Sequence, residues 1–411
     1  MRRVVITGMA GLCPIGNRWE DVARSLRAGS TGVEILPELG DYEGMSTRLA
    51  ARVHGFEVPP EYPRKKIRSM GRVSLMATRA TELALRQAGL TDDPVLTGGA
   101  TGVSYGSTGG SPPAMEVYAR ARYGNRSVKG IRATDYVQMM SHTVAANLAQ
   151  FFHLRGRLIP TCSACTSGSQ GIGFGYETIA SGRQDVMVTG GAEEFHPIDA
   201  AVFDIMYATS TRHQEPLSTP RPFDADRDGL VVAEGAATLV LEDLVHARRR
   251  GATILAEVVG FGTNCDGKHI TNPDSEGMEG AMRLALNDAG LSPGAIGYVN
   301  AHGTATPVGD IAESQATARV FGSSMPISSL KSFIGHTLGA CGSIEAWLTI
   351  EMMREKWFCP TLNLDNVDPA CGELDYIQCS PRELDVEYTM SNNFAFGGVN
   401  TSLIFRHWMD D

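Results

Sequence analysis

Short apolar runs alternate with amphipathic segments along most of this 411-residue chain. The run VVITG near the N-terminus is typical of a buried strand entering a glycine-rich turn. The segments Asp185–Glu194 and Ala237–Leu244 have the same continuous apolar character. Strands of this kind belong to sheets that are covered by helices on both faces. The alternation therefore predicts an α/β fold with a largely parallel or mixed, buried sheet.

Two segments with helical spacing resemble each other. ELALRQAGL at Glu82–Leu90 and RLALNDAGL at Arg283–Leu291 are identical at six of nine positions. Helices often end in glycine, so the shared Ala-Gly-Leu ending alone proves little. However, a strand-like run follows each helix, at Thr101–Gly110 and at Ile296–Pro307. The repetition of both helix and strand indicates that the chain contains two related halves.

The net charge of −10 makes general binding to nucleic acid or to an anionic membrane unfavourable. No apolar run reaches the length of a membrane span, and the apolar part of the N-terminus is short for a signal peptide. We therefore expect a cytoplasmic protein with no membrane span and no nucleic-acid partner. No low-complexity linker divides the chain, and the proline-bearing segment His213–Gly229 is predicted to be a long ordered loop.

The segment IPTCSACTSGSQGIG contains Cys162 and Cys165, for which three explanations compete. A structural zinc site needs about four ligands, and the sequence has no second CxxC pair. A thioredoxin-like pair normally opens a helix just after the first strand of a small domain, whereas this pair lies mid-chain. The third explanation fits better, because a strand entering a sharp turn and then a helix of small residues would place Cys165 at a helix N-terminus. There the helix dipole favours the nucleophilic thiolate. We expect no metal site.

Two histidines occupy similar junctions. His302 follows a strand in VNAHGTATPVGD, and His336 is predicted at the start of a small-residue helix, five residues after Lys331. A single histidine of this kind is more often a core residue whose hydrogen bonds are satisfied. Two such histidines, each next to a glycine in the sequence, favour a site shared with Cys165.

These motifs occur in the order SACTSG, NAHGTATPVGD, KSFIGHTLGACGSIEA and SNNFAFGGVNTSLIF, the last with two phenylalanines in a glycine-rich turn. The set resembles the β-ketoacyl-acyl carrier protein synthases of the thiolase superfamily, in particular the elongating, KAS II-like enzymes. The resemblance covers nearly the whole chain and implies a duplicated, five-layered αβαβα core. Residues 1–250 would form a half with the active-site cysteine and a basic docking patch, and residues 251–411 a half with the two active-site histidines.

The resemblance also implies the reaction: decarboxylative Claisen condensation of malonyl-acyl carrier protein with an enzyme-bound acyl thioester, giving 3-oxoacyl-acyl carrier protein. Cys165 matches the nucleophile, and His302 and His336 match the pair of hydrogen-bond donors to the developing negative charge. Lys331 and Glu345 match a charged pair that is expected to order His336 and tune its protonation. A buried ion pair without a chemical role is an equally weighted alternative.

Further residues are assigned to the substrate site by the same resemblance. Thr304 and Thr306 match hydroxyls that bond the pantetheine amides, and Phe394 and Thr271 are placed beside the substrate. Phe396 would gate the nucleophile, and its backbone N–H, with that of the cysteine, would hold the oxyanion.

Two positions depart from the pattern. Ala395 stands where many relatives have glycine, and its Cβ would restrict the movement of the loop. Gly109 stands where elongating relatives commonly carry a bulky aliphatic side chain at the bottom of the acyl pocket. Its lack of a side chain predicts a deeper acyl tunnel.

The run YPRKKIRSMGR is basic and contains no acid. Such runs are usually solvated faces, but the resemblance implies a strongly acidic partner, the acyl carrier protein. Arg64, Lys65 and Arg68 are therefore predicted to dock the carrier. Two other basic positions of the family are occupied here by Ser69 and Tyr207, so the preferred carrier is expected to differ from the housekeeping one.

Several alternatives stay open at this point. The chain would act as a homodimer, or as the active ketosynthase subunit of a heterodimer with a chain-length factor that makes polyketides or polyenes. A thiolase using coenzyme A is disfavoured because both histidines are present, where thiolases typically use a second cysteine. Retention of the cysteine, both histidines and the lysine argues against a catalytically inactive, binding-only relative. No cofactor is expected beyond the phosphopantetheine of the carrier.

Overall fold

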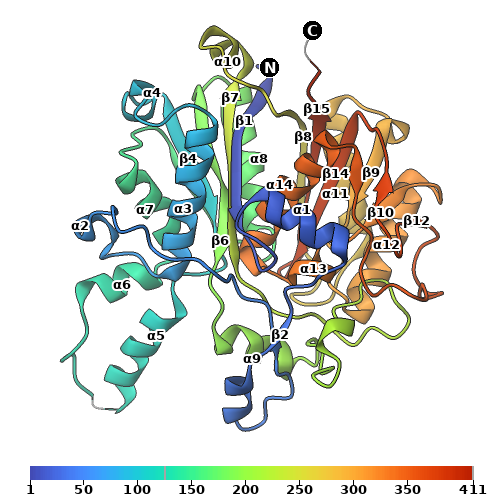
Figure 1. The fold of residues 1–411 in the computed structure, drawn as a ribbon, viewed down its shortest axis with the longest axis horizontal. Helices are drawn as coiled ribbons and strands as arrows, with labels where there is room; N and C mark the ends of the chain where they lie inside the picture. Colours follow the sequence, from blue (N-terminus) through green and yellow to red (C-terminus); the bar gives the residue numbers. More distant parts are fainter. Residues whose placement is uncertain (125, 410–411) are drawn as a thin grey trace.

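The computed structural model describes residues 1–124 and 126–409. Within them, eleven strands form one continuous mixed sheet (Figure 1). From its centre outward, the N-terminal part contains β1 (Val4–Leu12), β7 (Gly235–Asp243), β6 (Val186–Glu193), β4 (Thr101–Gly106) and β5 (Leu158–Thr161). The C-terminal part contains β8 (Ala256–Cys265), β15 (Val399–His407), β14 (Tyr388–Ala395), β9 (Ile296–Asn300), β10 (Pro326–Ser328) and β12 (Asp375–Tyr376).

The two parts meet where β1 pairs antiparallel with β8. Helix α3 (Arg72–Gln87) covers the outer face of β1 and β7, and α11 (Ser275–Ala289) covers the outer face of β8 and β15. Helices α8 (Ser167–Ala180) and α14 (Cys341–Arg354) pack against each other between the two sheet parts (Figure 1). This order of layers confirms the predicted αβαβα core.

The two copies of the internal repeat form equivalent elements in the two halves. They form the ends of α3 and α11, and each is followed by a glycine in the left-handed conformation, Gly89 with φ 69° and Gly290 with φ 66°. The strands that follow, β4 and β9, occupy equivalent positions: each is the fourth strand from the centre of the sheet in its part. Because α10 (Leu244–Arg249) separates β7 from β8, we retain residue 250 as our proposed boundary between the halves.

The central position of α8 explains its small residues. A Cβ at Gly173 would lie 2.3 Å from the ring of Phe261, and one at Gly171 would lie 2.5 Å from the carbonyl oxygen of Gly190. Larger side chains would force the two sheet parts away from the helix. The predicted small-residue helix is therefore present, although it begins at Ser167 and not at the cysteine.

The segment 213–229 is an ordered loop, as predicted, with one short turn of 3₁₀ helix, η3 (Pro216–Ser218). Ion pairs hold it to the body: Arg221 Nη2 lies 2.9 Å from Asp365 Oδ2, and Arg227 Nη1 lies 2.8 Å from Asp368 Oδ2. The last hairpin differs slightly from the prediction, because β14 extends to Ala395 and so includes Phe394 in a strand.

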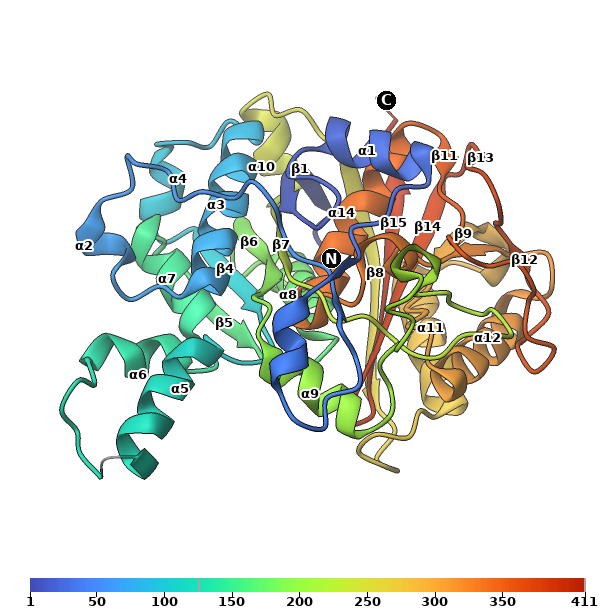
Figure 2. The same ribbon diagram turned by 60° about the horizontal axis from the view of Figure 1, so that its bottom comes forward.

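Strand β5 is the free edge of the N-terminal sheet part. Helices α5 (Pro112–Ala119) and α6 (Ala133–Met139) project from the body on the same side (Figure 2). No helix in residues 1–124 and 126–409 has both the length and the apolar character needed to cross a membrane.

Candidate active site

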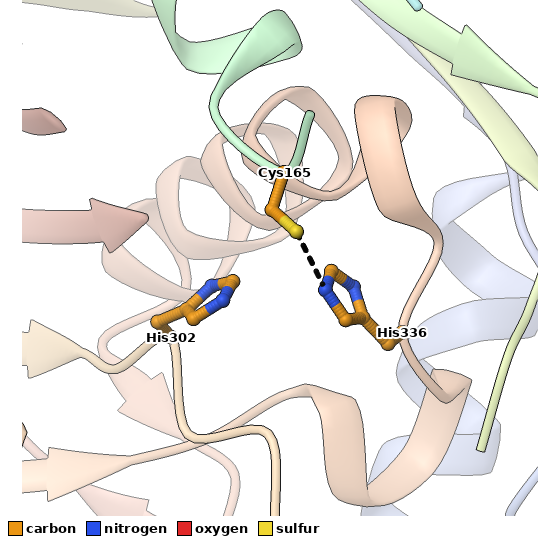
Figure 3. Close-up of side chains that lie close together, drawn as sticks. All are labelled: Cys165, His302 and His336. Carbon is orange, nitrogen blue, oxygen red and sulfur yellow. Dashed lines mark hydrogen bonds between the residues drawn. The ribbon is translucent and has the colours of Figure 1, made fainter. Parts of the chain in front are cut away.

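The ends of three chain segments bring Cys165, His302 and His336 together (Figure 3). All three side chains are buried. His336 Nε2 lies 3.1 Å from Cys165 Sγ, and the two imidazole rings lie 5.2 Å apart at 87°. The site thus joins a cysteine from the N-terminal half to two histidines from the C-terminal half.

The positions of the histidines relative to secondary structure are partly as predicted. His302 lies two residues beyond the end of β9, which agrees with the sequence prediction. His336 does not begin a helix: it lies between α13 (Lys331–Ile334) and the start of α14 at Cys341. The backbone of His336 instead pairs with Val231, which fixes the loop that carries the imidazole.

A tight turn presents the cysteine. Ala164 adopts a left-handed conformation, with φ 49°, which is uncommon for a residue with a side chain. Ser167 Oγ accepts the backbone N–H of Ser163 at 2.9 Å and donates to the carbonyl of Ala164 at 2.7 Å. The thiol of Cys341 donates to the carbonyl of Cys165 at 3.1 Å, a contact that the sequence analysis missed.

Hydrogen bonds fix the tautomer of both imidazoles. Nδ1 of His336 accepts the backbone N–H of Leu338 at 3.2 Å, so the ring proton of neutral His336 resides on Nε2, facing Cys165. The ammonium of Lys331 lies 3.1 Å from Nδ1 of His302. Because an ammonium only donates, neutral His302 also carries its proton on Nε2.

Both imidazoles are held in the neutral form. Burial lowers the pKa of His302 and His336 well below the usual value, and the positive charge of Lys331 lowers both further. The site therefore offers two neutral N–H donors, a set suited to stabilising negative charge on an oxygen.

Lys331 and Glu345 form a buried ion pair, and Asn393 Nδ2 donates to the second Glu345 oxygen at 2.7 Å. Burial alone would lower the pKa of Lys331, but the Glu345 carboxylate raises it, so the ammonium persists. The prediction that this pair orders His336 is wrong. Lys331 contacts His302, while Nδ1 of His336 is already occupied by a backbone N–H.

The protonation state of the resting Cys165 thiol also differs from the prediction, which favoured the thiolate. Burial raises the pKa of Cys165 to about 12, although Lys331 acts in the opposite direction. Helix α8 begins two residues after the cysteine, and burial of the thiol disfavours the thiolate. The thiol is therefore neutral at rest and must lose its proton as it attacks, while the His336 N–H stabilises the developing charge.

A cavity of about 280 Å³ opens onto the three residues. Its walls include the five residues assigned to substrate binding or gating in this region: Thr271, Thr304, Thr306, Phe394 and Phe396. Thr304 Oγ1 and Thr306 Oγ1 lie 2.8 Å apart. The predicted tunnel residue Gly109 is not among the described residues that line this cavity.

Sequence reasoning missed Glu313 on α12 (Pro307–Phe321). Its two carboxylate oxygens accept the backbone N–H groups of His302 at 2.7 Å and Gly303 at 2.6 Å. Burial raises its pKa to about 8. One turn earlier, Asp310 accepts the N–H of Ala305 at 3.2 Å. The sequence contains one signal of these roles: two acids, Asp310 and Glu313, stand three positions apart directly after the histidine motif.

The ligand atoms of Cys165, His302 and His336 lie within 4.8 Å of one another, which is close enough to share a metal ion. However, the Lys331 ammonium is only 3.1 Å from His302 and would repel a cation. The charge around this group favours an anionic oxygen.

Comparison with known families agrees with this geometry. Residues 1–247 match the family model described as "Beta-ketoacyl synthase, N-terminal domain", and residues 255–365 match "Beta-ketoacyl synthase, C-terminal domain". The chain belongs to the β-ketoacyl synthase family. The family predicted from the sequence motifs is thus confirmed.

Individual relatives cover the whole of this β-ketoacyl synthase. The chain is 40% identical over 415 residues to 3-oxoacyl-[acyl-carrier-protein] synthase 2 of Vibrio cholerae, covering 98% of this chain and 99% of the relative. A solved β-ketoacyl synthase from Burkholderia phymatum is 57% identical with a TM-score of 0.98, and each chain is covered completely. The solved ishigamide ketosynthase/chain length factor is 31% identical with a TM-score of 0.91, covering 99% of this chain and 100% of that one.

We predict that Lys331→Met lowers malonyl decarboxylation by about 100-fold, because His302 loses the contact that fixes its tautomer. It should also destabilise the fold by about 3–5 kcal/mol, since Glu345 is left buried without its cation. Release of CO₂ and thermal unfolding measure the two effects. The double variant Lys331→Met/Glu345→Gln is the control. It should recover stability but not decarboxylation, whereas recovery of both would show that the ion pair is only structural.

Proposed function

We propose that this β-ketoacyl synthase is an acyltransferase that condenses malonyl-acyl carrier protein with an acyl group held on Cys165, giving 3-oxoacyl-acyl carrier protein and CO₂. The observation that carries the proposal is one thiol beside two neutral imidazoles whose protonated Nε2 atoms are fixed by Leu338 and Lys331. Such a site supplies a nucleophile and donors to an enolate oxygen without a strong base.

In the first step, the sulfur of Cys165 attacks the thioester carbonyl of an acyl-carrier. The carbon–sulfur bond to the pantetheine breaks, and the proton of the cysteine passes to the departing thiolate. The N–H of His336 stabilises the charge on the sulfur during attack. Backbone N–H groups of Cys165 and Phe396 are proposed to hold the carbonyl oxygen, with the ring of Phe396 as a gate.

In the second step, the malonyl carboxylate leaves as CO₂, and the electrons of the broken carbon–carbon bond form an enolate. The Nε2–H groups of His302 and His336 stabilise the enolate oxygen. The enolate carbon then attacks the acyl carbonyl, Cys165 departs as a thiolate, and the thiolate takes up a proton from solvent.

The cavity wall is proposed to hold the phosphopantetheine arm of the carrier. Thr304 and Thr306 line the cavity, where their hydroxyls are proposed to bond the amides of the arm, and Thr271 and Phe394 form part of the same wall. No other cofactor is required by these steps.

Condensation itself tests the proposal. The enzyme is incubated with an acyl-carrier and malonyl-carrier, and the carrier product is identified by mass together with released CO₂. We expect a 3-oxoacyl-carrier two carbons longer than the acyl donor. Acyl transfer without CO₂ release, or a reaction that proceeds only with coenzyme A thioesters, would contradict it.

The proposed carrier-docking surface lies on α2 (Arg64–Ile67) and the following Arg68. Arg64, Lys65 and Arg68 are exposed, whereas Lys66 turns inward and donates to the carbonyl of Phe151 at 3.0 Å. Helix α2 lies on the flank of the molecule that carries β5 (Figures 1 and 2). In a dimer formed through that flank, a carrier bound to α2 would stand near the second protomer.

Charge reversal tests this surface. We expect Arg64→Glu/Lys65→Glu to raise the KM for an acyl-carrier by about tenfold, because an acidic carrier loses its electrostatic attraction. The same variant should use a short acyl-pantetheine thioester normally. Arg249→Glu, on α10 and away from α2 (Figure 1), is the matched control. If the variant lost activity equally with the acyl-carrier and with the acyl-pantetheine thioester, the effect would lie in the active site and not in carrier docking.

Gly109 is proposed to leave the acyl tunnel deep. A Cβ at this position would meet only Met115 Cε, at 3.9 Å, so it causes no close contact. We predict that Gly109→Ile slows loading of long acyl groups by about tenfold and spares short ones, because the added side chain occupies their space. Gly294→Ile, at a position equally free of close neighbours, is the control. Unchanged loading of long acyl groups on a folded variant would mean that Gly109 does not line the tunnel.

We propose that two chains associate through the β5 edge, beside which Met115, Tyr118 and Tyr136 expose large apolar surfaces. A homodimer is the first candidate. The similarity to an ishigamide ketosynthase/chain length factor supports the second, a heterodimer with a chain-length factor. Native mass spectrometry of the protein purified from its own cells distinguishes the two. We place the enzyme in the cytoplasm, where it would serve fatty acid, polyketide or polyene synthesis.

A further inference from the structure

The proton on Nε2 of His336 depends on the backbone that follows this residue. Leu338 donates its N–H to Nδ1 of His336 at 3.2 Å, which leaves the proton on the ring nitrogen that faces Cys165 (Figure 3). Leu338 adopts a left-handed conformation, with φ 46°, which is uncommon for a residue with a side chain. Such a conformation persists only where the surrounding structure enforces it. The tautomer therefore depends on what holds the segment on both sides of Leu338.

Hydrogen bonds from backbone N–H groups hold this segment. Before Leu338, the N–H of His336 bonds to the carbonyl oxygen of Val231 at 2.7 Å. After it, the N–H of Gly339 bonds to Oε2 of Glu193 at 3.1 Å. Gly339 is the middle residue of the short 3₁₀ helix η5 (Leu338–Ala340), and a Cβ on it would lie 2.8 Å from the same carboxyl oxygen. The absence of a side chain thus lets the backbone come this close to Glu193.

Glu193 is itself firmly placed. It is the last residue of β6, where it pairs with Gly235 of β7, and its side chain is buried. Its Oε2 also accepts the N–H of Thr108 at 2.9 Å, two residues beyond the end of β4. One oxygen atom therefore joins the sheet to the loop that carries His336. Nothing in the mechanism above uses this residue.

We propose that Glu193 is a positioning residue for His336. By holding Gly339, its Oε2 keeps the N–H of Leu338 on Nδ1, and the proton of the ring therefore stays on Nε2 as a donor to the enolate oxygen. Without this acceptor the segment 337–340 relaxes, and Nδ1 takes the ring proton in part of the molecules. The tautomer of His336 is a property of this chain alone, whereas its effect on decarboxylation rests on the proposed function.

Substitutions at Glu193 separate the position of the oxygen from its charge. Glu193→Gln keeps an acceptor at the same reach, and its neutral amide matches a carboxyl group whose pKa burial raises to about 8. Glu193→Asp keeps the acid but withdraws the oxygen by one methylene group, and Glu193→Met removes the acceptor. Glu194→Met is the matched control. Glu194 is the next residue and is also buried, but its carboxylate accepts the N–H of Val73 at 2.6 Å and the hydroxyl of Ser111 at 2.7 Å.

Two properties of each protein are measured. Nitrogen NMR of the His336 ring, assigned with the help of His336→Ala, shows which ring nitrogen carries the proton, and release of CO₂ from malonyl-carrier gives kcat and KM. We expect the wild type and Glu193→Gln to be protonated on Nε2 and to differ in kcat by no more than about twofold. Glu193→Asp and Glu193→Met should show a mixture of tautomers and a kcat about tenfold lower at unchanged KM. Glu194→Met should keep the wild-type tautomer.

The inference is overturned if folded Glu193→Asp or Glu193→Met keeps His336 protonated on Nε2 alone, or if Glu194→Met shows the same mixture. It is also overturned if the Asp variant behaves as the wild type while the Gln variant does not, since the charge would then matter and not the position of the acceptor. Wild-type His336 protonated on Nδ1 would overturn it without any variant. Absence of CO₂ release from every protein, the wild type included, would overturn the proposed function, and the tautomers would still decide this inference.

Discussion

Cys165→Ala is expected to abolish acyl loading and to lower condensation by about 10⁴-fold or more, because no other group in the site can carry the acyl chain. Cys165 is the only thiol within hydrogen-bonding distance of a histidine among the described residues of the cavity. Loading is measured by the mass of the intact protein, and condensation by the amount of 3-oxoacyl-carrier formed.

Cys162→Ala is the matched control for this prediction. The thiol of Cys162 lies three residues away, is exposed, and donates to the carbonyl of Thr108 at 3.0 Å. We expect the variant to keep at least about a third of wild-type activity, as surface substitutions usually have small effects. An equally complete loss in a folded Cys162→Ala protein would replace the single nucleophile with a paired-cysteine mechanism.

His302→Ala should lower decarboxylation by about 100- to 1000-fold while leaving acyl loading within about tenfold of the wild type. The reason is geometric: Nε2 of His336 contacts the sulfur of Cys165, whereas His302 is oriented by Lys331 and Glu313 and faces the cavity. His302 therefore serves the enolate and not the thiol. The two half-reactions are measured separately, as CO₂ release from malonyl-carrier and as acylation of the protein.

His336→Ala provides the comparison, because this residue touches both the sulfur and the cavity. It should impair acyl loading and decarboxylation together. If His302→Ala impaired loading as much as decarboxylation, the division of roles derived from these contacts would be wrong.

Much of the fold was available from the sequence. Continuous apolar runs such as that of Val186–Glu193 mark strands that are buried on both faces, and the repeated helix ending at Gly89 and Gly290 marks the two halves. The glycine-rich α8 follows from its place between two sheet parts, where side chains have no room. These features depend on local periodicity and on volume, which a sequence displays directly.

The details of the site depend on contacts between distant segments. Lys331 was predicted to order His336, yet it contacts His302, because folding brings the start of α13 against the segment that follows β9. The neutral thiol of Cys165 depends on burial that several elements produce together. Glu313 went unnoticed because its significance lies in what surrounds its carboxylate. Hydrogen-bond partners of this kind become visible only in three dimensions.

One measurement tests the central claim most directly. The protein is incubated with an acyl-carrier, freed of excess carrier, and weighed intact before and after addition of malonyl-carrier. We predict a single acyl adduct that maps to Cys165 and that disappears on addition of malonyl-carrier, with release of CO₂ and of a 3-oxoacyl-carrier two carbons longer. An adduct on another residue, or an adduct on Cys165 that malonyl-carrier does not remove, would contradict the account.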